Sequence, residues 1–86
     1  MDHKTEIHAY VAEILSQKDD NEPFADSSLL LSTGRIDSMD VVDIFLFLEK
    51  KFGVRIDSAR FKKTQVDSVD ALAALVSANL PSKPQN

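Results

Sequence analysis

Residues 33–56 have the sequence TGRIDSMDVVDIFLFLEKKFGVRI, and this stretch decides how the rest of the chain is interpreted. It predicts a helix that starts at Asp37-Ser38 and runs to about Phe52, because an apolar pattern of helical period follows a residue that can cap a helix. Gly53 supplies the C-terminal stop. The stretch therefore predicts one capped helix with a defined start and end.

The predicted helix has apolar side chains on two sides. At 100° per residue, one stripe suffices to dock the helix on a bundle, and it consists of Val41, Ile44, Phe45, Leu48 and Phe52. A second stripe lies roughly opposite, mixed with Asp43 and Lys50 and with Phe47 near its edge, and it consists of Met39, Val42 and Leu46. Two interpretations stay open from the spacing alone. Either the preceding loop covers the second stripe, or the stripe is an exposed recognition surface for a basic, partly apolar partner.

The rest of the chain predicts further helices and one long loop. A first helix is expected over about residues 3–17, a short helical turn over about 58–63, and a last helix from Asp67-Ser68 to about Asn79. No stretch alternates with period two over enough residues for a sheet. The predicted fold class is therefore all-α, a small bundle of three long helices and one short one.

The loop after the first helix has about 20 residues, QKDDNEPFADSSLLLSTGRI, which is long for a compact domain. It carries four large apolar side chains that a disordered segment would not keep, namely Phe24, Leu29, Leu30 and Leu31. We therefore expect the loop to fold back across the helices and fill the core.

Composition excludes several classes of protein. Eighty-six residues leave room for one domain and not for a two-lobed enzyme. The absence of cysteine excludes disulfides, thiolate metal sites and a cysteine nucleophile, and the net charge of −4 argues against a nucleic-acid binder. No apolar run approaches the ~18 residues of a membrane span, and the N-terminal sequence has no apolar signal core, so we expect a cytoplasmic protein.

The charge is unevenly distributed along the chain. Residues 1–49 contain three Lys and Arg against eleven Asp and Glu, whereas residues 50–63 contain six against one. Such asymmetry indicates either a surface that binds a partner or solvent-exposed charges without a specific role.

No catalytic or metal-binding motif is present. The sequence lacks GxGxxG, GKS or GKT, HExxH and GxSxG, and the acidic run over residues 19–22 lacks the ligand alternation of a calcium loop. His3 and His8 have no third ligand and are interpreted as surface residues. We therefore predict no catalysis by the chain itself.

A serine at a helix start is the remaining candidate. The common interpretation of Ser38 is a helix cap or first-turn residue. The alternative is that a phosphate esterified to Ser38 meets the free N–H groups and the positive dipole end of the helix, next to Asp40 in the first turn. Asp67-Ser68 repeats the pattern at the last helix. A turn that contains Gly34 precedes Ser38, and a helix with two apolar stripes follows it. This context favours Ser38 over Ser68 as the site of the phosphate ester.

At these residues the sequence resembles the acyl carrier proteins, over about residues 5–78. The resemblance implies a four-helix carrier bundle with a short third helix, and a 4′-phosphopantetheine arm on Ser38 that a phosphopantetheinyl transferase attaches from coenzyme A. Cargo would then be carried as a thioester on the thiol of the arm. It further implies that Asp37 is the flanking acid and that partner enzymes contact Met39, Asp40, Val42, Asp43, Leu46 and Glu49.

The chain departs from the fatty-acid-synthesis type of carrier. It has Glu49-Lys50-Lys51 where that type has a run of acids, Phe47 where a small or acidic residue is usual, and a basic segment with Arg60, Lys62 and Lys63. The segment over residues 61–67 is more similar to D-alanyl, other aminoacyl or specialised carriers.

These observations predict a free-standing, monomeric carrier with its domain over residues 1–80 and a flexible tail over 81–86. Its expected partners are the transferase, an acyl- or aminoacyl-loading ligase and a downstream transferase or synthase. The alternative is a small helical interaction module that is never modified.

Overall fold

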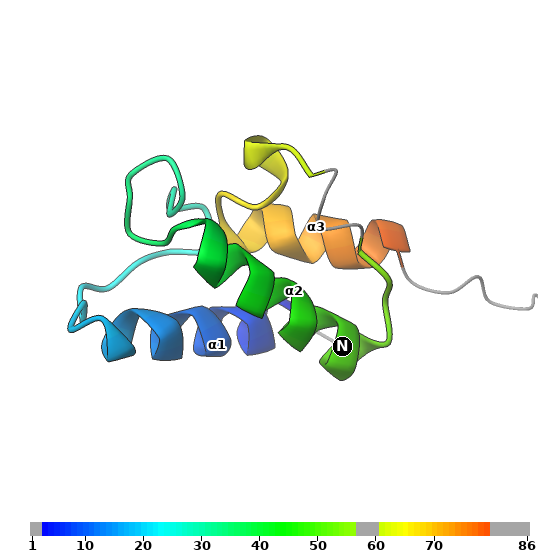
Figure 1. The fold of residues 1–86 in the computed structure, drawn as a ribbon, viewed down its shortest axis with the longest axis horizontal. Helices are drawn as coiled ribbons and strands as arrows, with labels where there is room; N and C mark the ends of the chain where they lie inside the picture. The colour runs from blue at the N-terminus through cyan, green and yellow to red at the C-terminus, as the bar shows by residue number, and fades with distance from the viewer. Residues whose placement is uncertain (1–2, 57–60, 80–86) are drawn as a thin grey trace, which may run out of the picture.

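The computed structural model describes residues 3–56 and 61–79. It contains three α-helices, α1 (His3–Gln17), α2 (Ser38–Phe52) and α3 (Val69–Asn79), and a short 3₁₀ turn, η1 (Lys63–Gln65). Figure 1 shows α1 and α3 running along the long axis of the molecule, with α2 crossing obliquely beside them. The described residues contain no strand, so the predicted all-α class is confirmed for them.

The predicted short third helix is the point at which the fold differs. Residues 57–60, and with them much of the predicted turn at 58–63, lie outside the described residues. Residues 61 and 62 are not helical, and the turn that is described, η1, begins at Lys63 and ends at Gln65. A count of four helices is therefore not confirmed. The predicted tail over 81–86 also lies outside the described residues.

The bounds of α2 follow from local chemistry, as the sequence predicted. Asp37 is the N-cap, with an extended backbone at φ −124°, and its carboxylate accepts the backbone N–H of Asp40. Gly53 ends the helix with φ 69°, in the left-handed region where glycine carries no Cβ penalty, and its N–H donates to the Glu49 carbonyl. Both predicted ends are confirmed.

The core lies between the three helices and is completed by the loops. Its fully buried side chains come from α1 (Ile7, Val11, Leu15), α2 (Val41, Ile44, Leu48), α3 (Val69, Leu72, Val76) and the connecting segments (Leu30, Ile36, Val66). The long loop does fold back, because Leu30 is buried and Phe24 and Leu31 pack against the core. The expectation for Leu29 was wrong: its side chain is 54% exposed.

The long loop is fastened to the start of α3. One carboxylate oxygen of Asp67 accepts three consecutive backbone N–H groups, from Leu30 at 2.9 Å, Leu31 at 2.7 Å and Ser32 at 3.0 Å. The next residue, Ser68, caps α3, since its Oγ accepts the N–H of Ala71 at 3.1 Å. The predicted helix start at Asp67-Ser68 is confirmed, with Ser68 as the cap.

No helix among the described residues is both long and apolar enough to cross a membrane.

Candidate functional site

Ser38 is the first residue of α2 and is exposed to solvent. It is bracketed by a reciprocal pair of hydrogen bonds: the Asp37 carboxylate accepts the N–H of Asp40, and the Asp40 carboxylate accepts the N–H of Asp37, each at 3.0 Å. This capping box fixes the backbone on both sides of Ser38. The serine is thereby presented at the positive end of a 15-residue helix with two carboxylates beside it.

Lys18, directly after α1, reaches these carboxylates. Its ammonium group forms an ion pair with Asp40 and lies 3.7 Å from a carboxylate oxygen of Asp37. The hydrogen bond to Asp40 raises the pKa of Lys18, while the N–H of Asp40 and the Lys18 charge lower the pKa of Asp37. The ion pairs of Lys18 therefore connect the end of α1 to the start of α2, next to Ser38.

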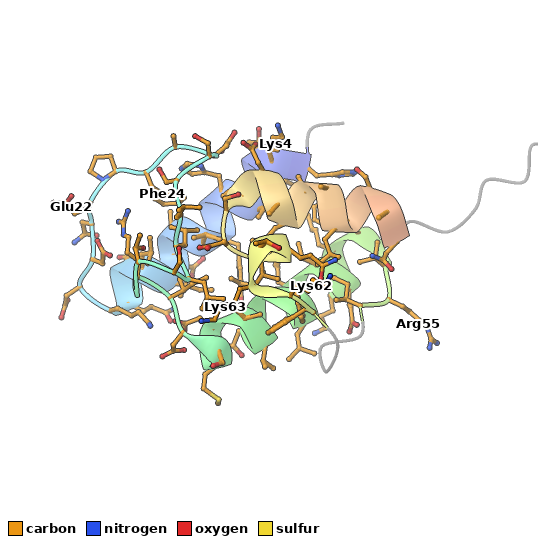
Figure 2. The ribbon with its side chains drawn as sticks, turned by 90° about the horizontal axis from the view of Figure 1, so that it is seen from above. Lys4, Glu22, Phe24, Arg55, Lys62 and Lys63 are labelled. Carbon is orange, nitrogen blue, oxygen red and sulfur yellow. The ribbon has the colours of Figure 1, made fainter. Side chains whose placement is uncertain are left out.

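A second ion pair holds the turn before Ser38. The Arg35 guanidinium donates to both carboxylate oxygens of Asp20 at 2.9 Å and to the Glu22 carbonyl at 2.8 Å. The hydrogen bonds from Arg35 to the carboxylate lower the pKa of Asp20. The guanidinium also lies 5.6 Å from the centre of the Phe24 ring. Figure 2 shows Glu22 and Phe24 on the loop that follows α1. The loop and the turn before Ser38 thus hold each other in place.

The second Asp-Ser pair has a different environment. Asp67 and Ser68 are each only 8% exposed, and both side chains are used in the hydrogen bonds that hold the loop and cap α3. Ser38 is exposed, and Asp37 rather than Ser38 supplies the cap of its helix. The two pairs are alike in sequence, but only one presents its serine to an external reagent.

The second apolar stripe of α2 is exposed. Met39 is 74% exposed, Leu46 56% and Val42 44%, so the interpretation that the long loop covers this stripe was wrong. Phe47 does not join the stripe. Its ring stacks on Tyr10 at a centroid distance of 4.1 Å and packs against the core from the α1 side.

The three acidic residues predicted around this stripe lie in different environments. Asp43 is exposed, Asp40 is committed to Lys18 and the capping box, and Glu49 is half-buried with its carboxylate accepting the Ile56 N–H at 3.1 Å. Asp37, Ser38 and Asp40 therefore gather at one helix end. Glu49 has a structural role at the other end, where it holds the chain that leaves α2.

Sequence reasoning missed the ion pairs. All three cations of residues 1–49 are paired with acids: Lys4 with Asp70 at 2.9 Å, Lys18 with Asp40, and Arg35 with Asp20. The available signal was the scarcity of cations among many acids, but the partners are distant in sequence and could not be assigned from it.

The two histidines are partly buried and not simple surface residues. His8 stacks on Phe24 at 4.1 Å and contacts Asp26 at 2.9 Å, and His3 packs edge-on against Phe52 at 4.8 Å. The described residues contain no group of three potential ligands that could hold a metal ion.

Residues 5–76 match the family described as phosphopantetheine attachment site. Comparison with curated proteins and with solved structures gives no match.

Proposed function

This chain belongs to the phosphopantetheine attachment family, and from that premise we propose that Ser38 carries its prosthetic group and that the protein is an acyl or aminoacyl carrier. The covalently attached group of this family is 4′-phosphopantetheine, and the chain is a carrier of that group. Its thiol supplies the thioester chemistry, which explains how a chain without cysteine can carry acyl cargo. The alternative of a module that is never modified is disfavoured by the family match.

The exposure of Ser38 is the observation that carries the choice of residue. Attachment from coenzyme A requires the serine oxygen to reach a phosphorus atom in the site of another enzyme. The Ser38 oxygen forms the new P–O bond and loses its proton, the pyrophosphate bond of coenzyme A breaks, and adenosine 3′,5′-bisphosphate leaves. Ser68 is buried and its oxygen accepts a backbone N–H, so it is a poor acceptor for this transfer.

The start of α2 suits a phosphodiester. The helix dipole favours an anion at the first turn of α2, although the N–H of Asp40 is already donated to the Asp37 carboxylate. Lys18 offsets part of the negative charge of Asp37 and Asp40, which would otherwise repel the phosphate. The residues present at this position therefore fit the group.

We assign partner docking to the exposed stripe and its acidic border. Met39, Val42 and Leu46 form an uncovered apolar surface that leads away from Ser38 along the helix, and Asp43 is exposed beside it. A phosphopantetheinyl transferase, a loading ligase and a downstream transferase or synthase would contact this surface in turn. Asp40 would contribute through its charge, since its hydrogen bonds are already in use.

The basic segment that follows α2 favours a carrier of a dedicated pathway. Lys62, just before η1, and Lys63, its first residue, are both exposed. Phe61, which precedes them, packs edge-on against Phe45 of α2 at 5.3 Å. Figure 2 shows Lys62 and Lys63 at the start of η1, and Arg55 after α2. This basic segment supports a carrier of the D-alanyl, aminoacyl or specialised type. We further propose that it acts as a monomer in the cytoplasm, with no catalytic activity of its own.

Intact mass tests the proposal directly. The chain is incubated with a promiscuous phosphopantetheinyl transferase and coenzyme A, and we expect the mass of one phosphopantetheine to be added. Ser38→Ala should abolish the gain and Ser68→Ala should retain it. Modification of Ser38→Ala, or no gain by the wild-type chain, would contradict the proposal.

A further inference from the structure

We propose that Lys18 is a positioning residue for the modification of Ser38, acting through the carboxylates of Asp37 and Asp40. The inference rests on the proposed attachment at Ser38. It assigns a role to a residue that no motif contains and that lies 20 positions before the serine.

The position of Lys18 is determined by the end of α1. The helix ends at Gln17, and the backbone N–H of Lys18 donates to the Leu15 carbonyl at 2.9 Å. From this anchored backbone the side chain reaches the start of α2, where its ammonium group meets Asp40. The contact therefore joins an anchored helix end to the first turn of α2.

Lys18 and the capping box share the same atoms. The Asp40 oxygen that accepts the Asp37 N–H also receives the Lys18 ammonium, and the second oxygen of Asp37 lies 3.7 Å from that ammonium. Without Lys18, the two carboxylates beside the serine lose the one cation that pairs with them among the described residues. Their repulsion weakens the box that fixes the backbone on either side of Ser38.

The charge of Lys18 also acts on the reagent. Coenzyme A brings a pyrophosphate to Ser38, and a site with two unbalanced carboxylates repels it. Because the Lys18 side chain is about one-third exposed, this effect is modest and screened by salt. We expect the loss of Lys18 to lower kcat/KM for transfer about fivefold at low salt, and less at high salt.

A general role in joining the two helices must be distinguished from this one. Lys51, in the last turn of α2, forms an ion pair with Glu6 of α1 at 2.9 Å, so it also connects these two helices by a lysine and an acid. That pair lies at the opposite end of α2 from Ser38. Lys51 is therefore a matched control for the loss of one interhelical ion pair.

The experiment measures transfer of phosphopantetheine from coenzyme A by mass for Lys18→Met, Lys18→Arg and Lys51→Met. Thermal melting verifies that each variant is folded. We expect Lys18→Met to be slower, Lys18→Arg to restore most of the rate, and Lys51→Met to match the wild type. In an Asp40→Asn background, the further loss on Lys18→Met should shrink, because the carboxylate through which Lys18 acts is gone.

The proposal is overturned by a wild-type rate for Lys18→Met, or by an equal loss for Lys51→Met. An effect of Lys18→Met that is unchanged in the Asp40→Asn background also contradicts it. If the wild-type chain itself gains no mass, the attachment at Ser38 fails instead, so the two failures are distinguishable.

Discussion

The backbone N–H of Leu31 donates a 2.7 Å hydrogen bond to the Asp67 carboxylate, across 36 positions of sequence. The same oxygen accepts the N–H groups of Leu30 and Ser32. Burial of Asp67 disfavours its charge, but these three donors outweigh burial and lower the pKa of the carboxyl. One acid therefore determines where the long loop crosses the start of α3.

Replacement of Asp67 should loosen this loop. Asp67→Ala removes the acceptor of the Leu31 and Ser32 N–H groups, whereas the Leu30 N–H keeps its 2.7 Å hydrogen bond to the backbone carbonyl of residue 67, and we expect a loss of ~2 kcal/mol in the free energy of unfolding. Asp67→Asn keeps one oxygen acceptor without the charge and should cost less. Urea unfolding measures both, and equal stability of Asp67→Ala and wild type would contradict the account.

Acid should destabilise the protein through the same group. The folded pKa of Asp67 lies below its unfolded value of ~3.9, so its contribution is fully present above that value. The contribution is lost as the pH falls through the folded pKa, because the unfolded state binds more protons. We expect the melting temperature to fall below about pH 4.

The control for acid destabilisation is a carboxylate on the exposed surface of α2. Asp67→Asn should flatten the fall in melting temperature, whereas Asp43→Asn should leave it close to that of the wild type. An unchanged acid profile of Asp67→Asn would show that other carboxylates, such as Asp20 and Asp37, carry the effect.

Two neighbouring leucines of α2 should separate docking from folding. Leu46 is 56% exposed and Leu48 is buried in the core. Leu46→Glu should leave the melting temperature nearly unchanged and weaken recognition by the transferase about tenfold, measured as kcat/KM of modification. Leu48→Ala should lose ~2–5 kcal/mol of stability. A large stability loss from Leu46→Glu would mean that the stripe belongs to the core.

Local patterns predicted the helices, whereas distant pairings were out of reach. The bounds of α1 follow from periodicity, and those of α2 from periodicity, the Asp37 cap and the Gly53 stop, which are all read within a few residues. The exposed stripe stayed undecided because spacing shows which side chains share a face and not what covers that face. Leu29 was expected in the core with the other large apolar side chains of the loop, yet it is 54% exposed, whereas Leu30 is buried.

The candidate site shows the same division. The Asp-Ser pattern marked two serines equally, and the difference between them is produced by contacts from elsewhere in the chain. Asp67 is buried because three N–H groups of the loop converge on it, and Asp37 is exposed beside Lys18. These contacts span between 19 and 37 residues, a separation at which no local pattern assigns partners.

Replacing the two serines should have opposite effects on stability and on modification. Ser68→Ala removes the Oγ that accepts the Ala71 N–H, so we expect it to cost ~1 kcal/mol while the chain is still modified. Ser38→Ala should change stability by less than ~0.5 kcal/mol, because Asp37 supplies the cap, while modification is lost.

Thermal melting and intact mass, measured on the same preparations of Ser68→Ala and Ser38→Ala, test this contrast. A stable Ser68→Ala would contradict the capping role, and a modified Ser38→Ala would move the attachment site elsewhere. If Ser38→Ala instead unfolded, its loss of modification would carry no information. Ser38→Thr would then separate the effects, because threonine keeps the hydroxyl with one added methyl group at an exposed position. A folded Ser38→Thr that is modified at a reduced rate is the result expected if the hydroxyl at this position is the acceptor.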